Sequence, residues 1–311
     1  MHACGPGGEG TDRPLVPGIN PGGDHDRNAR GANGRAATGL GPHLDRSISR
    51  LSEFHSAALL RRQHFFCLDR SRGWVAFYYP VQDTSSIATT IDGGKHWTIQ
   101  EVGGVGLGPG TIFFSNRLKG WVGLFNSVQQ RPSIAANVDG GEHWAIQEVD
   151  GVDYSPTSLF FLNEHDGWLM LFMTGSTHRD LQCKLLRTND GGATWAELHS
   201  RNFLPPCGWM RFISRQIGWV IGSSGEGDST RLWITSTGGN TWSRHSLPMP
   251  RNCKHCEILF HEPPQFRDSR HGTFWVDLVV GRMETLDVTY VTDNGGLSWR
   301  IAKSVTEIPS Y

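Results

Sequence analysis

The sequence has no excess of charge of either sign, because 29 Lys and Arg residues are balanced by 30 Asp and Glu residues. A protein that holds a nucleic-acid backbone or an anionic membrane surface needs a clustered basic surface, and the overall charge supplies no such field. The chain also lacks an apolar run of about 18 residues and, as written, a basic start followed by an apolar segment. We therefore expect no nucleic-acid partner and no membrane insertion, and we see no signal peptide.

Cysteine is scarce, with six residues scattered through 311, so the chain is not a small disulfide scaffold. Cys253 and Cys256 have the spacing of half a zinc site, but a second pair at matching spacing is missing. They are weak metal candidates, and a redox-active or incidental pair is the alternative. A disulfide between Cys183 and Cys207 is conceivable only in an exported protein. We expect no metal and no cofactor, and the compartment stays open.

Residues 1–50 lack aromatic side chains and contain 11 Gly and 5 Pro. This composition cannot bury enough apolar surface to offset the loss of chain entropy, so it predicts a disordered tail. A flexible tether, a processed leader and translated sequence upstream of the true start are the alternatives. The next segment, from Ile48 to Arg62, fits either a short helix or an extended strand that leads into the second region, residues 51–311.

An eight-residue box, Thr/Ser-x-Asp-x-Gly-x-x-Trp, is written five times, and its last residue recurs at intervals of 47, 51, 47 and 57 residues. Glycine allows a turn with positive φ, and the short polar side chain at the third position can accept backbone N–H groups across that turn. Asp is replaced in two copies, which favours a structural turn over a catalytic carboxylate. The third positions are Asp92, Asp139, Asp190, Thr237 and Asn294, and the tryptophans are Trp97, Trp144, Trp195, Trp242 and Trp299.

A second motif precedes each box and consists of an apolar pair, a polar turn, and then Gly-Trp with an apolar run. The box tryptophan follows the tryptophan of this motif by 23, 23, 27, 23 and 24 residues, so the two motifs keep register. In the fifth copy Gly272 is displaced by two residues from the tryptophan. The tryptophans assigned to this motif are Trp74, Trp121, Trp168, Trp219 and Trp275.

The segments between the motifs are short runs of β-branched and aromatic residues without a 3.6-residue periodicity. Four antiparallel strands in each unit of about 47 residues are typical of a propeller blade. In the third unit we expect strands at 158–162, 167–173, 184–188 and 194–199. The sequence therefore predicts an all-β propeller with five countable blades, either a ring of five or a ring that is degenerate or incomplete at one end.

The five boxes resemble the Asp-box (BNR) repeat of propeller proteins. Together with the Gly-Trp motif, from about Phe65 to Ile301, they more specifically resemble the photosystem II assembly and stability factor family (Ycf48/Hcf136-like). The resemblance implies a non-catalytic scaffold that binds another polypeptide, which in photosynthetic members is an early photosystem II assembly intermediate. It also implies seven blades and, in many members, an exported or lumenal location. The specific partner does not transfer with the fold.

The alternative is a glycoside hydrolase of the sialidase/BNR-repeat type, which would bind carbohydrate. An enzyme resembling sialidases would need an Arg cluster, a Tyr activated by Glu, an acidic Asp and an Arg-x-Pro signature in the first blade. Arg13-Pro14 and Arg131-Pro132 lack the spacer residue, and Tyr154 has no obvious Glu nearby. Two carboxylates from different blades could still act as a pair. We expect no enzyme and name no catalytic residue.

Overall fold

The computed structural model describes residues 61–79, 83–104, 106–151, 153–174, 182–198, 206–223, 231–251, 253, 256–261, 263–280 and 285–307. The predicted tail of residues 1–50 lies outside these ranges, as does most of the segment that leads into the second region. The chain divides into two compact units, Met1–Ile112 and Phe113–Tyr311, and each is described by itself. Within the described ranges, no helix has the length and apolarity needed to cross a membrane.

Unit 1 contains one complete antiparallel sheet, in the order β1-β2-β3-β4. Phe65, Val75, Phe77 and Ala88 form a cluster of buried side chains on this sheet. The strands are β1 (Arg61–Cys67), β2 (Gly73–Tyr79), β3 (Thr84–Thr90) and β4 (Thr98–Val102).

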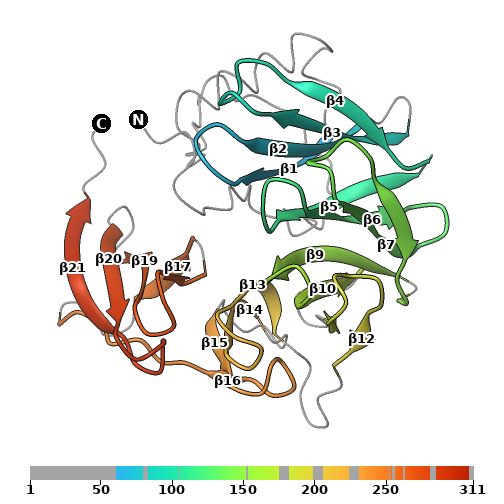
Figure 1. Ribbon diagram of the computed structural model, residues 1–311. Coiled ribbons are helices and arrows are strands. Elements are labelled where there is room, and N and C mark those ends of the chain that lie inside the picture. The colour runs from blue at the N-terminus through green and yellow to red at the C-terminus, as the bar shows by residue number, and fades with distance from the viewer. Residues whose placement is uncertain are drawn as a thin grey trace, which may run out of the picture. The chain divides into compact units, whose positions relative to one another are not determined.

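Four further antiparallel sheets follow in chain order (Figure 1). The first of them begins with β5 (Leu107–Phe114), which crosses the boundary between the units, and continues with β6 (Gly120–Asn126), β7 (Arg131–Asn137) and β8 (Ala145–Glu148). The next two contain β9 (Tyr154–Phe161), β10 (Gly167–Met173), β11 (Cys183–Thr188) and β12 (Ala196–Glu197), then β13 (Cys207–Phe212), β14 (Gly218–Ser223), β15 (Arg231–Thr235) and β16 (Ser243–Arg244). The last contains β17 (Glu257–Phe260), β18 (Gln265–Phe266), β19 (Gly272–Val279), β20 (Thr285–Thr292) and β21 (Arg300–Glu307).

Each sheet is called a blade here, numbered 1 to 5 along the chain, and its strands are called first to fourth. In blade 5, β17 and β18 both pair with β19 and share the place of the first strand. The described residues form strands and turns and no helix, and strands that are consecutive in a blade pair antiparallel. This confirms the all-β prediction of repeated four-stranded propeller blades.

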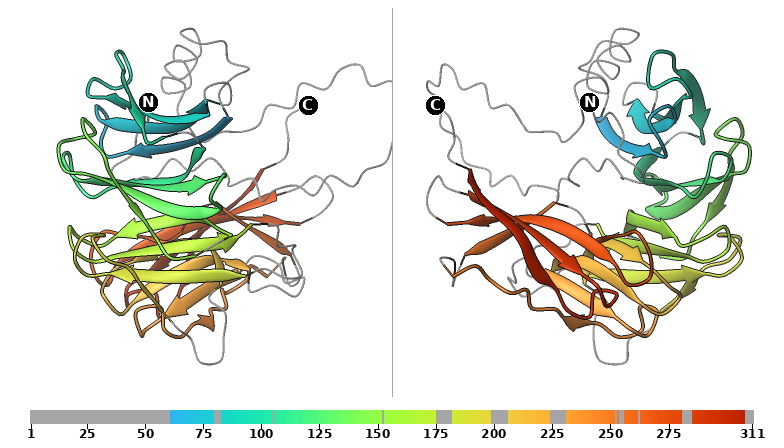
Figure 2. Two further views of the ribbon diagram at one scale, coloured as in Figure 1. Left: turned by 90° about the vertical axis from the view of Figure 1, so that its right-hand side faces the viewer. Right: turned by 60° about the vertical axis from the view of Figure 1, so that its left-hand side comes forward.

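The apolar core follows the second strands. β6, β10 and β14 are buried on both faces, whereas the side chains of β8, β12 and β16 are exposed. Blade 5 differs, because buried and less buried side chains alternate along β20 and along β19. In β19 the side chains of Phe274, Val276 and Leu278 are buried, and their neighbours in sequence are less buried. Its strands β19 to β21 run side by side, as the right-hand view of Figure 2 shows. One face of blade 5 packs into the core, and the other carries mainly polar side chains.

The strand register defines a common position in every blade. A glycine opens each second strand. It pairs with Cys67 in blade 1 and with a phenylalanine of the first strand in blades 3 and 4, where Gly167 pairs with Phe161 and Gly218 with Phe212. In blade 5, Gly272 pairs with Phe266 in the same way. The glycine is therefore in place, and it is the tryptophan that is displaced. Thr273 occupies the position held by tryptophan in the other blades, and Trp275 lies two residues further along β19.

Candidate functional site

The five boxes form one kind of turn between the third and fourth strands of each blade. The first residue of the box accepts a hydrogen bond from the N–H of the second glycine at 2.7–3.0 Å, in turns that begin at Thr90, Asn137, Thr188, Thr235 and Thr292. The third residue accepts one from the N–H four residues later at 2.9–3.0 Å, whether that residue is Asp, Thr or Asn. Thr237 and Asn294 thus occupy the same place in the turn as the three aspartates.

Each box docks on the turn between the first and second strands of its own blade. The N–H of its first glycine donates to a carbonyl of that turn at 2.8–2.9 Å in all five blades, for example from Gly191 to His165. Gly191 has a φ of 77°, and a Cβ there would lie 2.7 Å from the Glu164 carbonyl oxygen, so a side chain would clash. The two turns therefore form one hydrogen-bonded end of each blade, which we call the box end.

The box carboxylates are held in the ionised form. Hydrogen bonds from the Thr194 side chain and backbone lower the pKa of Asp190 to about 2. Hydrogen bonds from the backbone and side chain of His96 likewise lower the pKa of Asp92. For Asp139, burial would raise the pKa, but hydrogen bonds led by those from His143 outweigh it and lower the pKa. A carboxyl group with a lowered pKa is a poor general acid, since such an acid needs a raised pKa.

The tryptophans of the Gly-Trp motif join neighbouring blades of unit 2. Trp121 stacks on Phe161 of the next blade with 3.6 Å between ring centroids, and its Nε1–H donates to the Gly191 carbonyl at 2.8 Å. Trp168 repeats this arrangement on Phe212 at 3.8 Å. Its Nε1–H donates to a carbonyl of the next box at 3.0 Å. Each of these rings therefore contacts both motifs of the following blade.

The box tryptophans contact the first strand of their own blade. Trp195 meets Phe161 edge-on, with ring centroids 5.9 Å apart. Trp242 meets Phe212 of its own blade in the same manner at 6.2 Å. The box tryptophan thus closes the blade on itself, and the Gly-Trp tryptophan of the preceding blade stacks on the same phenylalanine.

Asp166 is a buried carboxylate at the boundary of blades 3 and 4, and no sequence motif points to its role. Its side chain is 1% exposed and accepts hydrogen bonds from Arg215 Nε and Asn163 Nδ2, both at 2.9 Å. Burial alone would raise the pKa of Asp166, but these hydrogen bonds and the charges of Arg215 and Arg187 lower it. The carboxylate therefore serves as a structural ion-pair partner.

Two groups could be considered for metal binding. Cys253 and Cys256 are joined in a disulfide, so neither offers a thiolate in this structure. Ligand atoms of Asp139, Glu142 and His143 lie within 4.8 Å of one another in the second box. Asp139 already accepts hydrogen bonds from the backbone N–H groups of Glu142 and His143 and contacts His143 Nδ1 at 2.7 Å. The hydrogen bonding of the turn therefore explains this cluster without an ion.

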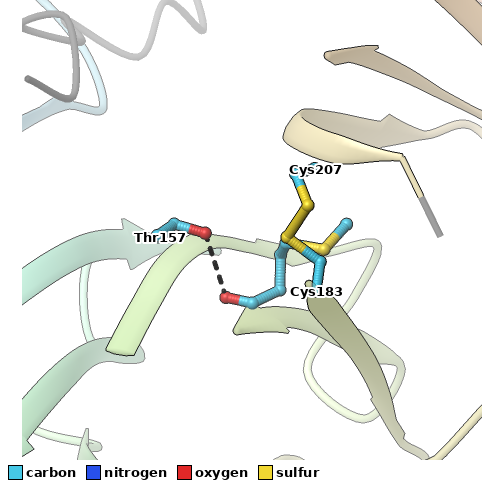
Figure 3. The surroundings of a disulfide bond; sticks show 4 residues. Thr157, Cys183 and Cys207 are labelled. Carbon is cyan, nitrogen blue, oxygen red and sulfur yellow. Dashed lines mark hydrogen bonds between the residues drawn. A yellow bond between two sulfur atoms is a disulfide. The ribbon is translucent and has the colours of Figure 1, made fainter. Parts of the chain in front are cut away.

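A second disulfide joins Cys183, at the start of β11, to Cys207, at the start of β13 (Figure 3). It links blade 3 to blade 4 with a sequence separation of 24 residues. The sequence had left this pair open, because it requires an oxidising environment. Beside the disulfide, Thr157 Oγ1 donates to the Met170 carbonyl at 3.3 Å and ties β9 to β10.

Aliphatic side chains protrude from the box end. In blade 2, Leu118 is 59% exposed and Val138 is 68% exposed, on the two turns that the hydrogen bond from Gly140 to the Leu118 carbonyl holds together. Leu297 in the box of blade 5 is 63% exposed. Exposed apolar side chains gathered on neighbouring turns are typical of surfaces that contact another protein. We call Leu118 and Val138 the blade 2 apolar pair.

No protein-family description and no curated protein matches the chain. Among solved structures, a GH74 enzyme from Niastella koreensis is 15% identical, with a TM-score of 0.46, covering 74% of this chain and 36% of the enzyme. YCF48 from Cyanidioschyzon merolae is 16% identical, with a TM-score of 0.39, covering 76% of this chain and 83% of that protein. A polysaccharide lyase, the PL25 ulvan lyase, is 8% identical, with a TM-score of 0.48, covering 79% of this chain and 70% of the lyase. The chain thus spans only about a third of the GH74 enzyme's length.

Proposed function

We propose that this protein is a non-catalytic propeller scaffold that binds another polypeptide through the box end. The observation that carries the proposal is the blade 2 apolar pair, two exposed aliphatic side chains on turns that a hydrogen bond joins. A rigid apolar surface binds at a lower entropic cost than a mobile one, because little freedom is lost on contact.

The polar groups of the box end support binding over catalysis. All carboxyl groups with a shifted pKa among the described residues are shifted downward, namely Asp92, Asp139, Asp166, Asp190 and Asp268. A glycoside hydrolase of the alternative type needs one carboxyl group with a raised pKa to protonate the leaving group. Tyr154, a conceivable nucleophile of such an enzyme, is buried and has the Lys184 ammonium 4.9 Å from its ring centroid.

The finer proposal, a photosystem II assembly or stability factor, rests on the two sequence motifs that keep register through the chain. Under it the partner is a photosystem II assembly intermediate. The apolar turns of the box end would then contact a polypeptide of that intermediate. The proposal that the chain binds a polypeptide does not depend on this identity.

The test is to charge the apolar pair and follow retention of proteins from an extract of the source cells. Leu118→Glu and Val138→Glu should fold normally and lose the proteins that the unchanged chain retains. Val128→Glu is the matched control, because Val128 is 74% exposed in the turn between β6 and β7, at the opposite end of the same blade. Equal retention by all variants, or hydrolysis of a carbohydrate substrate by the purified chain, would contradict the proposal.

A further inference from the structure

The disulfide between Cys253 and Cys256 differs from the one between Cys183 and Cys207 in what it connects. Its cysteines are three residues apart in the segment between β16 and β17, so it joins no two blades. A cross-link that closes a short loop removes little entropy from the unfolded chain, whereas one that closes a 24-residue loop removes more. Stabilisation of the fold therefore explains Cys183–Cys207 better than it explains Cys253–Cys256.

The two sulfurs of the short disulfide lie in different surroundings. Cys253 is 1% exposed and belongs to the buried cluster that contains Trp219 and Tyr290, whereas Cys256 is half-buried at the margin of that cluster. Exchange requires a thiolate to reach one of the two sulfurs. Cys256 is the more exposed of the two residues, so it is the better target for a thiolate from solution.

The segment before the disulfide is anchored on blade 5. The hydroxyl of Tyr290, a fully buried side chain, donates to the Pro248 carbonyl at 2.8 Å. The Cys253 N–H donates to the Pro250 carbonyl at 3.0 Å. These contacts do not involve the sulfur atoms, so opening the disulfide does not itself break them.

We propose that Cys253 and Cys256 form a redox-active pair that exchanges with a dithiol on a client polypeptide. A client thiolate attacks Cys256 Sγ, the Cys253–Cys256 bond breaks, a mixed disulfide forms at Cys256, and Cys253 leaves as the thiolate. The second client thiol then attacks the client sulfur of the mixed disulfide. The client dithiol loses two electrons and becomes a disulfide. Cys253 and Cys256 gain these two electrons and the two client protons and become thiols. This activity goes beyond the scaffold role and does not depend on it.

The first experiment uses the unchanged full-length chain, with its other described disulfide as the internal control. The folded protein is equilibrated with increasing dithiothreitol, alkylated, and each cysteine is followed by peptide mass spectrometry. We expect Cys253 and Cys256 to be half reduced at a dithiothreitol concentration at least tenfold below that needed for Cys183 and Cys207. Reduction of both disulfides over the same concentration range would overturn the proposal.

The second experiment tests the direction of attack with single variants and oxidised glutathione as the probe. In Cys253→Ser the free Cys256 should form a mixed disulfide with glutathione, and in Cys256→Ser the buried Cys253 should react at least tenfold more slowly. Equal rates in the two variants would overturn the assignment of Cys256 as the accessible sulfur. If a variant does not fold, the dithiothreitol titration of the unchanged chain decides the proposal by itself.

Discussion

Blades 3 and 5 differ at the position that follows the glycine of the second strand. In blade 3 this position holds Trp168, which is fully buried and stacks on Phe212 of the next blade. In blade 5 it holds Thr273, and the nearby Trp275 is 48% exposed and stacks on His261 of its own blade at 4.0 Å. The two tryptophans therefore differ in burial: Trp168 is covered by Phe212 of the next blade, whereas the displaced Trp275 stays half exposed.

The largest expected effect is the difference in stability between variants of Trp168 and of Trp275. Trp168→Ala should lower the free energy of unfolding by about 3–5 kcal/mol, since it removes a buried ring and leaves a cavity between two blades. Trp275→Ala should cost less than about 1 kcal/mol, because water already covers half of the side chain. Urea unfolding of both variants beside the unchanged chain measures the difference. Equal losses would show that blade 5 is covered on its outer face in solution.

The second effect concerns the covalent link at the same boundary of blades 3 and 4. Replacing Cys183 and Cys207 together by Ala should lower the free energy of unfolding by about 3 kcal/mol, as the chain-entropy argument gives for a loop of 24 residues. The double replacement of Cys253 and Cys256 is the matched control, because the disulfide that it removes closes a much shorter loop. Thermal unfolding of the two double variants under oxidising conditions tests this order. A larger loss in the control would remove the structural role of the long link.

The third effect is the contribution of the ionised Asp190 carboxylate to the stability of its box. The pKa of Asp190 is about 2, below the ordinary 3.8, so folding favours its ionised form. Its contribution is fully present above about pH 4 and is lost as the pH falls toward 2. Asp190→Ala should cost about 1 kcal/mol near neutral pH, the value of roughly one hydrogen bond.

Asp190→Asn is the matched control for this effect, because Asn294 already accepts the equivalent hydrogen bond from Ser298 N–H at 3.0 Å in blade 5. The asparagine variant should keep most of the stability at neutral pH and lose part of the dependence between pH 4 and pH 2. Unfolding by urea at several pH values provides the measurement. An unchanged pH dependence would mean that other carboxyl groups account for it.

The sequence predicted the repeat and most strands correctly because both motifs lie within single blades. β10 spans Gly167–Met173, the expected range, and β9 begins four residues before the expected start at Ser158. Contacts between blades were beyond reach, because Trp168 and the Gly238 carbonyl that accepts its hydrogen bond are 70 residues apart. Nothing in a single sequence states which side chain crosses that boundary.

The displaced tryptophan of blade 5 shows a second limit. Spacing from Trp275 suggested that Gly272 was out of place, and only the pairing of Gly272 with Phe266 and Thr292 fixes the register. Asp166 illustrates the same limit for charge, because its partner Arg215 lies 49 residues away in the next blade. Long-range pairing decides both features, and neither motif carries that information.

The smallest expected effect sharpens the comparison between the two stacked pairs. The coupling free energy between Trp168 and Phe212, from a double-mutant cycle, should be about 0.5–1.5 kcal/mol, the range of buried aromatic pairs. The coupling free energy between Trp275 and His261 should be below about 0.5 kcal/mol. The reason is that Trp275 is already about half exposed to water, so separating the two rings exposes little further surface. Asp277 Oδ2 lies 2.8 Å from His261 Nε2, so the cycle is repeated with Asp277→Asn to remove that contribution. A coupling at Trp275 as large as that at Trp168 would mean that burial by the next blade is not what gives the buried pair its strength.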